Sequence, residues 1–322
     1  MKKTGKLIPL LGILVLSCSA IGCSRALSEV KASDERANTE TSEQAFSGTE
    51  GNFPLTLEIG ENEIIVEAKP TRILSLSPSA TEILFAIGAG DQVAAVDEQS
   101  NYPPEAPMSG ISGYTPNLES IIALEPDLVV HSYLPEDIEK GLANVGIPSL
   151  PQLAPLTLED TYQQISQLGL VTGNTESAQS IIQIMQERVD QLIVRASSHG
   201  SLSFYHELDQ SYFSVTSMTF IGQIYATLGL ENIADAADSA GSGYPQLSEE
   251  YILSQNPDLI FLADTKCCAQ SLETVKQRNG WRALSAVENQ KVIELDDDIA
   301  SRWGPRIIQF FEEIVDAMEQ ID

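Results

Sequence analysis

Apolar and polar residues are arranged along this chain in a pattern that predicts short buried strands followed by amphipathic helices. Residues 71–76 contain a β-rich apolar run, and the serine and proline that follow it are typical of a turn. A helical spacing of apolar residues then continues to Gly88, a residue type that often ends helices. Asn117 precedes a second helical segment, 118–124, and a turn leads from it into the apolar run 128–130. Strands that alternate with helices indicate mostly parallel sheets covered on both faces.

The same order of elements occurs a second time. The second copy contains a strand, a helix, another helix and a buried strand, at residues 202–205, 217–228, 247–254 and 258–261. Pro126 and Pro257 precede corresponding strands, and Gly88 and Gly229 end corresponding helices. The glycines lie somewhat further apart in the sequence than the prolines, which a difference in loop length explains. The chain is therefore predicted to be a diverged duplication.

A long helical segment separates the two copies. Its apolar side chains recur at helical spacing over residues 175–196, at Ala178, Ile181, Ile182, Met185, Val189 and Leu192. One long helix restricts hinge motion far more than a flexible crossover would. The predicted fold class is therefore α/β, with two similar lobes, each a mostly parallel sheet flanked by helices, joined by one long rigid helix.

The N-terminus carries an export pattern. Three lysines precede the apolar run 7–16, which is too short to span a bilayer. Ala20-Ile21-Gly22-Cys23 resembles a bacterial lipobox, so Cys23 is the expected lipidation site, with Cys18 as the alternative. Residues 24–52 are rich in Ser, Thr, Glu and Ala, which favours a disordered tether over an amphipathic helix.

The predicted organisation follows from these segments. A lipoprotein signal peptide, a tether, an N-terminal lobe, a connecting helical segment and a C-terminal lobe are expected at residues 1–22, 23–52, 53–155, 156–198 and 199–322. We expect a monomer, held outside the cytoplasm on a membrane by its lipid anchor.

Charge and motifs exclude several function classes. The formal net charge of −28 would repel nucleic-acid backbones, so nucleic acid is not an expected partner. The sequence contains no nucleophile elbow, no phosphate-binding glycine loop and no His-Glu-x-x-His motif. We expect no catalytic residue, no resident metal and no cofactor.

Three motifs together resemble one family. R-I-L-S-L-S-P-S-A-T-E-I-L-F-A-I-G, N-L-E-S-I-I-A-L-E-P-D-L-V-V and R-W-G-P-R are similar to the periplasmic-binding proteins that serve cobalamin and ferric-siderophore ABC importers. The resemblance covers nearly all of the chain from Pro54 onward. It implies that the protein captures a metal chelate in a cleft between its lobes and delivers it to a permease. It also implies an acidic docking residue on each lobe, a place that Glu82 matches in the first copy and Gln223 occupies in the second.

The ligand is expected beyond the carboxyl ends of the strands, where open α/β sheets bind their ligands. The loops at those ends contribute the predicted ligand-binding residues Ser77, Pro78, Tyr102, Tyr114, His131, Tyr133, His206, Glu207, Tyr212, Asp264, Lys266, Arg302 and Trp303. Exposed aromatic side chains on facing loops suit a large planar ligand, because each buries much area at a low entropic cost.

Three ligand classes remain open. Cobalamin or a related corrinoid is favoured, because Tyr102 and Tyr114 resemble aromatic contacts of cobalamin binders and no basic cluster is evident. Lys266, Arg302 and Arg306 could instead hold an anionic ferric siderophore or haem. A different class of protein, a divalent-metal-binding or structural surface lipoprotein, would use His131 and His206 as metal ligands.

Cys267 and Cys268 are adjacent in the sequence. Consecutive Cα atoms lie about 3.8 Å apart, below the usual range for a disulfide, so a bond between them would be strained. The two residues could be thiols that face the cleft, a strained disulfide, or part of a loop.

Overall fold

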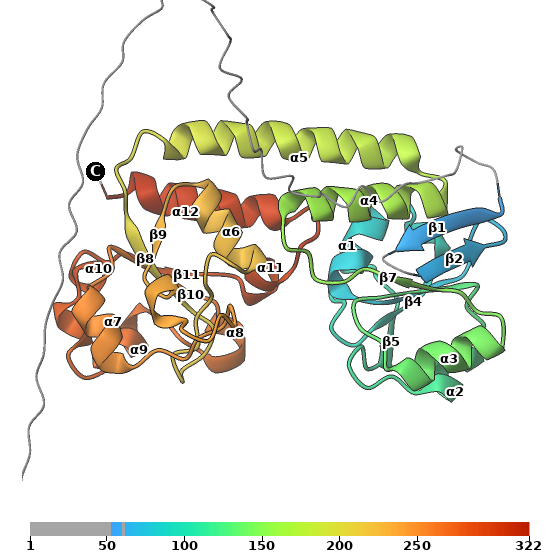
Figure 1. Cartoon of the computed structure of the whole chain (residues 1–322), viewed down its shortest axis with the longest axis horizontal. Helices are drawn as coiled ribbons and strands as arrows, with labels where there is room; N and C mark the ends of the chain where they lie inside the picture. Colours follow the sequence, from blue (N-terminus) through green and yellow to red (C-terminus); the bar gives the residue numbers. More distant parts are fainter. Residues whose placement is uncertain (1–52, 60–61, 322) are drawn as a thin grey trace, which may run out of the picture. The chain divides into compact units, whose positions relative to one another are not determined.

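Two parallel sheets, one in each half of the chain, form the frame of the molecule (Figure 1). The computed structural model describes residues 53–59 and 62–321, all of which belong to one compact unit, residues 44–322. The predicted signal peptide, Cys23 and the tether lie outside the described residues.

The first lobe contains a five-stranded parallel sheet in the order β5-β4-β3-β6-β7. Its strands are β3 (Ile73–Leu76), β4 (Val93–Asp97), β5 (Met108–Ile111), β6 (Leu128–His131) and β7 (Ser149–Pro151), preceded by the antiparallel hairpin β1 (Leu55–Ile59) and β2 (Asn62–Val66). Its helical segments are α1 (Pro78–Ala86), η1 (Gly90–Gln92), α2 (Leu118–Ala123) and α3 (Glu136–Asn144).

The second lobe contains a four-stranded parallel sheet in the order β11-β10-β8-β9. Its strands are β8 (Ser203–Glu207), β9 (Glu231–Asn232), β10 (Leu259–Leu262) and β11 (Val292–Glu294). Its helical segments are α6 (Phe220–Thr227), η2 (Asp235–Ala237), α7 (Glu249–Gln255), α8 (Thr265–Cys268), α9 (Leu272–Gln277), η3 (Trp281–Ala283), α10 (Ser285–Glu288), α11 (Asp297–Ser301) and α12 (Ile307–Glu319). The predicted fold class is confirmed.

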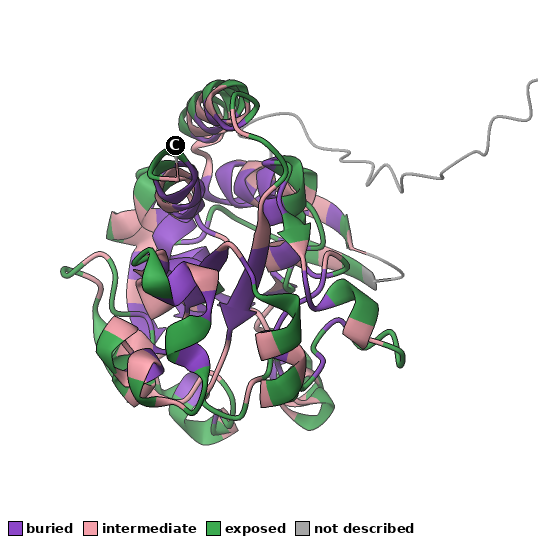
Figure 2. Cartoon of the chain, turned by 90° about the vertical axis from the view of Figure 1, so that its left-hand side faces the viewer, coloured by how far each residue is buried: buried purple, intermediate pink, exposed green. Residues whose placement is uncertain are grey.

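The central strands are buried throughout and mostly apolar because helices cover both faces of each sheet. Every residue of β3, β6 and β10 is buried. Figure 2 shows the buried residues concentrated in the sheets and on the inner sides of the helices. One apolar cluster runs from Ile83 in α1 through Met185 to Phe310 in α12, so the two lobes share part of their core.

The duplication is visible in one repeated set of hydrogen bonds. Asp127, at the start of β6, accepts bonds from the backbone N–H and the hydroxyl of Thr71. Asp258, at the start of β10, accepts the same two bonds from Ser203. Each aspartate directly follows one of the paired prolines, Pro126 and Pro257. The paired prolines therefore mark equivalent points in the two lobes.

The predicted connector is a helix over its full length. α4 (Leu158–Thr172) precedes α5 (Thr175–Ala196), and Ala178, Met185 and Val189 lie on the buried side of α5. This buried side faces α4 and the C-terminal helix α12 (Figure 1). Within the described ranges, no helix is long and apolar enough to cross a bilayer.

One helix prediction needs correction at its start. The helix predicted over 217–228 begins only at Phe220, because Thr219 caps it by accepting from the N–H of Gly222. Cys267 and Cys268 lie in the short helix α8, as free thiols.

Candidate ligand cleft and interlobe network

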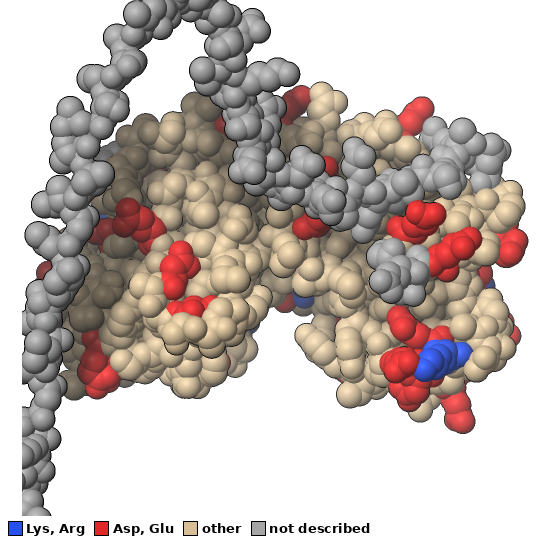
Figure 3. Space-filling view, viewed as in Figure 1, with Lys and Arg blue, Asp and Glu red and all other residues tan. Residues whose placement is uncertain are grey.

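Apolar side chains from both halves of the chain line a cavity of about 280 Å³. Leu156 enters it from the loop between β7 and α4, and Met218, Tyr244 and Trp303 enter it from the second lobe. Leu156, Met218 and Tyr244 are at least half exposed. Figure 3 shows the surface hollowed between the two lobes. We refer to this region as the cleft.

Exposed aromatic rings follow the carboxyl ends of strands in both lobes. Tyr114 follows β5 and is 76% exposed, and Tyr133 follows β6 and is 55% exposed. In the second lobe, Phe213 follows β8 and is 37% exposed. These partly exposed rings lie beyond strand ends, at the edge where open α/β sheets usually bind their ligands.

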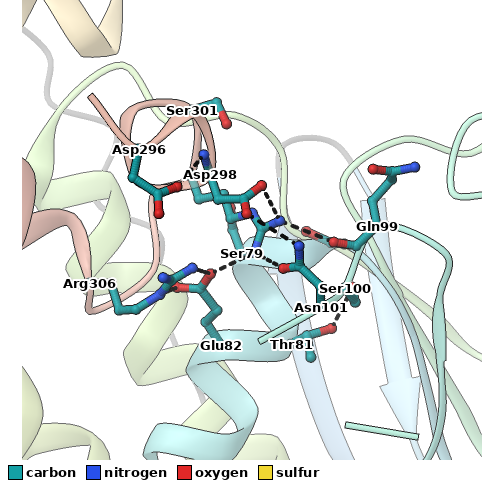
Figure 4. A network of polar contacts seen from close by, with 12 residues as sticks. Ser79, Thr81, Glu82, Gln99, Ser100, Asn101, Asp296, Asp298, Ser301 and Arg306 are labelled. Carbon is teal, nitrogen blue, oxygen red and sulfur yellow. Dashed lines mark hydrogen bonds and ion pairs between the residues drawn. The ribbon is translucent and has the colours of Figure 1, made fainter. Parts of the chain in front are cut away.

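Glu82 is not on the surface. It is 3% exposed on α1, and its carboxylate pairs with the guanidinium groups of Arg302 and Arg306 from the second lobe (Figure 4). Arg302 Nη1 lies 3.1 Å from Glu82 Oε1, and Arg306 Nε donates to Glu82 Oε2 at 3.0 Å. The prediction that Glu82 is an exposed docking residue is wrong, because two arginines hold its charge inside the molecule.

The network extends from Glu82 to polar side chains of both lobes. Arg302 also donates to Asn101 Oδ1 at 2.9 Å and to Asp298 Oδ1 at 2.7 Å. Lys266 Nζ donates to Asp298 Oδ2 at 2.9 Å, and Asn101 donates to the same oxygen at 3.2 Å. We call Glu82, Asn101, Lys266, Asp298, Arg302 and Arg306 the interlobe network.

The Arg-Trp-Gly-Pro-Arg motif is the second-lobe half of this network. A Cβ on Gly304 would lie 2.9 Å from Glu82 Oε2, so only glycine lets the backbone approach the carboxylate this closely. The Trp303 N–H donates to Ser79 Oγ, and its indole N–H donates to Gln164. The motif therefore positions one lobe on the other.

Tyr102 lies against this network. The Arg306 guanidinium is centred 3.9 Å from the Tyr102 ring, and both residues line a second cavity of about 570 Å³ between α1, α5 and α12. Tyr102 thus has a cation–π partner of its own.

The two histidines that were predicted as cleft residues are buried. Burial lowers the pKa of His131 to about 4, and neither of its ring nitrogens forms a hydrogen bond within the described chain. Burial lowers the pKa of His206 to about 3, and its Nδ1 lies 2.9 Å from the hydroxyl of Tyr225. His206 also packs on Phe310 of α12. Both side chains lie within their own lobes because each occupies an inward-facing position of its strand.

Glu207 and Tyr212 also belong to the packing of the second lobe. Glu207 is fully buried and forms a two-pronged ion pair with Arg278. Tyr212 stacks on Trp281, and the Arg278 guanidinium lies over both rings. These contacts occupy the polar groups that were predicted to face a ligand.

Asp264 is buried, and neither of its oxygens has a hydrogen-bond partner within the described chain. Burial, reinforced by the nearby negative charge of Glu207, raises its pKa to about 7.

Ser77 is buried as the N-cap of α1, where it accepts from the N–H of Ala80, and Pro78 begins that helix. Both Ser77 and Pro78 are structural residues of the helix start.

Sequence reasoning missed Tyr244 and Met218, whose exposed side chains line the cleft. The duplication contained a signal for Tyr244. When the two copies are aligned on their paired prolines, Tyr114 corresponds to within one position to Tyr244. No comparable signal existed for Met218, which lies in a turn without a counterpart in the first lobe.

Comparison with known proteins assigns the family. Residues 73–299 match the model of the periplasmic binding protein family. The chain belongs to this family. A vitamin B12-binding protein of Pectobacterium carotovorum is 32% identical over 77% of this chain and 88% of its own length. An uncharacterised ABC transporter substrate-binding lipoprotein of Bacillus subtilis is 28% identical over 83% of this chain and 86% of its own length. The crystal structure of the vitamin B12-binding protein BtuF of Vibrio cholerae superposes with a TM-score of 0.63 at 28% identity, and covers 78% of this chain and 97% of that one.

Membership of this family fixes the general function. The chain is an ABC-importer substrate-binding protein of the type that serves vitamin B12, siderophores and haem, and such proteins bind a small molecule and deliver it to a permease outside the cytoplasm. The family is one of solute-binding transport proteins rather than of enzymes. In the part of the chain that the structure describes, no three His, Cys, Asp or Glu side chains are arranged to hold a metal ion.

This periplasmic binding protein has exposed acids at equivalent positions of its two lobes. Glu119 lies in the first turn of α2 and Glu250 in the first turn of α7, and both are exposed. Their separation in the sequence equals that of Pro126 and Pro257, so the duplication relates them. Gln223 is exposed, and its amide donates to the carbonyl of Ser217.

Proposed function

We propose that this periplasmic binding protein captures a corrinoid such as cobalamin in the cleft and delivers it to its permease. The observation that carries the proposal is a set of exposed aromatic and apolar side chains: Met218 and Tyr244 line the cleft, and Tyr114, Tyr133 and Phe213 follow strand ends of the two lobes. A large ligand with extensive apolar faces would bury these side chains without a need for free cations. Vitamin B12-binding relatives that are about a third identical support the choice.

The charge pairs of the interlobe network disfavour a ferric siderophore or haem as the ligand. An anionic siderophore or the propionates of haem require cations that are free to pair with them. Lys266, Arg302 and Arg306 already pair with Asp296, Asp298 and Glu82. A bidentate anion would have to displace a carboxylate from one of these groups before it could bind.

Titration calorimetry tests the ligand. The protein without its tether would be titrated with cyanocobalamin, haem, a ferric hydroxamate siderophore and divalent metal salts. We expect cobalamin to bind with micromolar or tighter affinity and the others to bind more weakly. Tight binding of haem or of the siderophore alone would replace the corrinoid with that ligand, and tight binding of a bare divalent metal alone would overturn the chelate class.

Aromatic contacts supply a second test. Tyr114→Ala and Tyr244→Ala should each weaken cobalamin binding by about 1–3 kcal/mol, because each removes a ring that the ligand would bury. Val194→Ala removes an equally exposed apolar side chain from α5 and should leave affinity unchanged. Equal affinities for all three variants would place the ligand elsewhere.

For docking we propose Glu119 and Glu250 in place of Glu82. Both are exposed helix-start acids related by the duplication, so a two-lobed permease surface could meet both in the same way. Glu119→Gln and Glu250→Gln should slow association with the transporter and reduce its salt dependence without altering ligand affinity. Glu136→Gln, at an exposed first-turn acid of α3, is the matched control. Loss of association from Gln223→Ala instead would restore the docking site implied by the family resemblance.

We also propose that Cys23 carries the lipid anchor. Cys23→Ser should abolish incorporation of labelled palmitate and release the protein from the membrane. Palmitate that still enters this variant, but not Cys18→Ser, would assign the anchor to Cys18.

A further inference from the structure

Two adjacent cysteines lie in α8, outside the lining of the cleft cavity and next to Lys266 of the interlobe network. Cys267 is exposed and Cys268 is half-buried, and both are free thiols. The neighbouring Cys268 thiol, together with burial, raises the pKa of Cys267 to about 12. Among the described residues these are the only cysteines. Neither the proposed ligand site nor the proposed docking site uses them.

We propose that Cys267 and Cys268 are a reversible redox site, which closes to a disulfide between adjacent residues by exchange with a low-molecular-weight disulfide. In the first step the Cys267 thiolate attacks one sulfur of that disulfide, forms a mixed disulfide and expels one thiolate. The Cys268 thiolate then attacks the Cys267 sulfur and expels the second thiolate. The protein loses two electrons and two protons, and the small disulfide becomes two thiols.

The geometry makes such a bond labile rather than structural. Consecutive Cα atoms are about 3.8 Å apart, whereas disulfides usually span about 4.4–6.8 Å. Strained or exposed disulfides have the more oxidising potentials, which is typical of regulatory pairs. The exposure of Cys267 lets a small disulfide reach it, and the next residue in the chain supplies the resolving thiol.

Closure should also disturb the interlobe network. Asp297 accepts hydrogen bonds from the backbone N–H groups of Lys266 and Cys267, and Lys266 Nζ binds Asp298. To form a bond, the two sulfurs must come to about 2.05 Å from each other, and adjacent side chains on a helix do not face each other. The backbone of α8 must therefore leave its helical conformation, which releases the bonds to Asp297 and moves Lys266.

Mass spectrometry tests the redox site in the full chain, with Cys18→Ser and Cys23→Ser to leave only this pair. After incubation with oxidised glutathione, we expect an intact mass lower by two hydrogens, no free thiol, and full reversal by dithiothreitol. The rate should rise about tenfold per pH unit near neutrality, because the thiolate of Cys267 is the attacking species. A persistent glutathione adduct, or no reaction, would overturn the proposal.

Two further measurements separate ring closure from ordinary thiol reactivity. Adding Cys268→Ser should trap a stable mixed disulfide on Cys267, because the resolving thiol is missing. In the oxidised protein with both cysteines, hydrogen exchange at the amides of Lys266 and Cys267 should accelerate as the bonds to Asp297 break. Unchanged exchange after complete oxidation would disprove the coupling to the interlobe network.

Discussion

At the scale of single residues, buried charge distinguishes positions that stabilise the protein from positions that can meet a ligand. The family resemblance implies that Glu82 is an exposed docking acid. The structure instead pairs it with two arginines from the far end of the chain, Arg302 and Arg306. No local pattern contains that information. The arginine motif and the acid were both visible in the sequence, but their pairing arises only when the second lobe packs on the first.

Glu82→Gln should lower the free energy of unfolding by about 3 kcal/mol. Removing one member of a buried ion pair leaves its partner's charge uncompensated, although Asp298 still pairs with Arg302. Urea unfolding followed by circular dichroism measures the change. Glu312→Gln removes the partly exposed partner of Arg188 and should cost less than about 1 kcal/mol. Equal losses of unfolding free energy in the two variants would mean that the burial of Glu82 does not determine how much it stabilises the protein.

Asp264 should make stability depend on pH. Its pKa rises from the ordinary 3.8 to about 7 on folding, so the folded protein binds a proton that the unfolded chain releases. The resulting stability is fully present below about pH 4 and is lost as the pH rises through about 7. Asp264→Asn removes this titration, so we expect the variant to gain stability relative to the wild type between about pH 4 and about pH 8.

Urea unfolding at about pH 4 and about pH 8 measures the stability difference between Asp264→Asn and the wild type. Asp91→Asn, at an exposed side chain of η1, is the control and should track the wild type. A constant gap between Asp264→Asn and the wild type would show that Asp264 titrates normally in the folded protein.

At the scale of elements, the sequence predicts correctly those helix limits that local patterns define. α5 has the predicted limits because apolar spacing and flanking turns define it from within the segment. The start of α6 was placed too early because Ser217, Met218 and Thr219 are compatible with a helix. A turn ending in the Thr219 cap replaces that first part. His131 and His206 were assigned to the cleft from their strand ends, but each faces inward, an orientation that depends on packing outside its own strand.

The first turn of α6 leaves no room for a side chain at Gly222. A Cβ there would lie 1.9 Å from the carbonyl oxygen of Thr216, a backbone atom that cannot rotate away. Gly222→Ala should therefore lower the free energy of unfolding by at least about 1–3 kcal/mol. The control is Gly200→Ala, where a Cβ would meet nothing within 4 Å. A urea midpoint for Gly222→Ala equal to that of the control would mean that the turn moves freely.

At the scale of the whole molecule, α5, α12 and the interlobe network together join the lobes. Apolar contacts along α5 and α12 continue the core from one lobe into the other. The network adds a polar contact between α1 and the Arg302–Arg306 segment (Figure 4). This combination favours small closure movements over a wide hinge. The interlobe network is the part of this connection between the lobes that a single substitution can weaken.

Pulsed electron paramagnetic resonance can measure how firmly the two lobes are held at one distance from each other. Spin labels at the exposed positions Asn144 and Gln255, which end α3 and α7, report the distance between the lobes. Cys18, Cys23, Cys267 and Cys268 are first replaced by serine so that only the introduced cysteines are labelled. In this background we expect the bound ligand to shift the mean distance by only a few ångströms, because one continuous helix and a shared core resist bending.

Glu82→Gln should broaden the distance distribution before any ligand is added, since Arg306 loses the carboxylate that ties it to α1. Glu312→Gln should not broaden it, because its ion pair links α5 to α12 without reaching α1. A wide closure in the parent protein would show that α5 bends, and an unchanged distribution in Glu82→Gln would show that apolar packing alone sets the angle between the lobes.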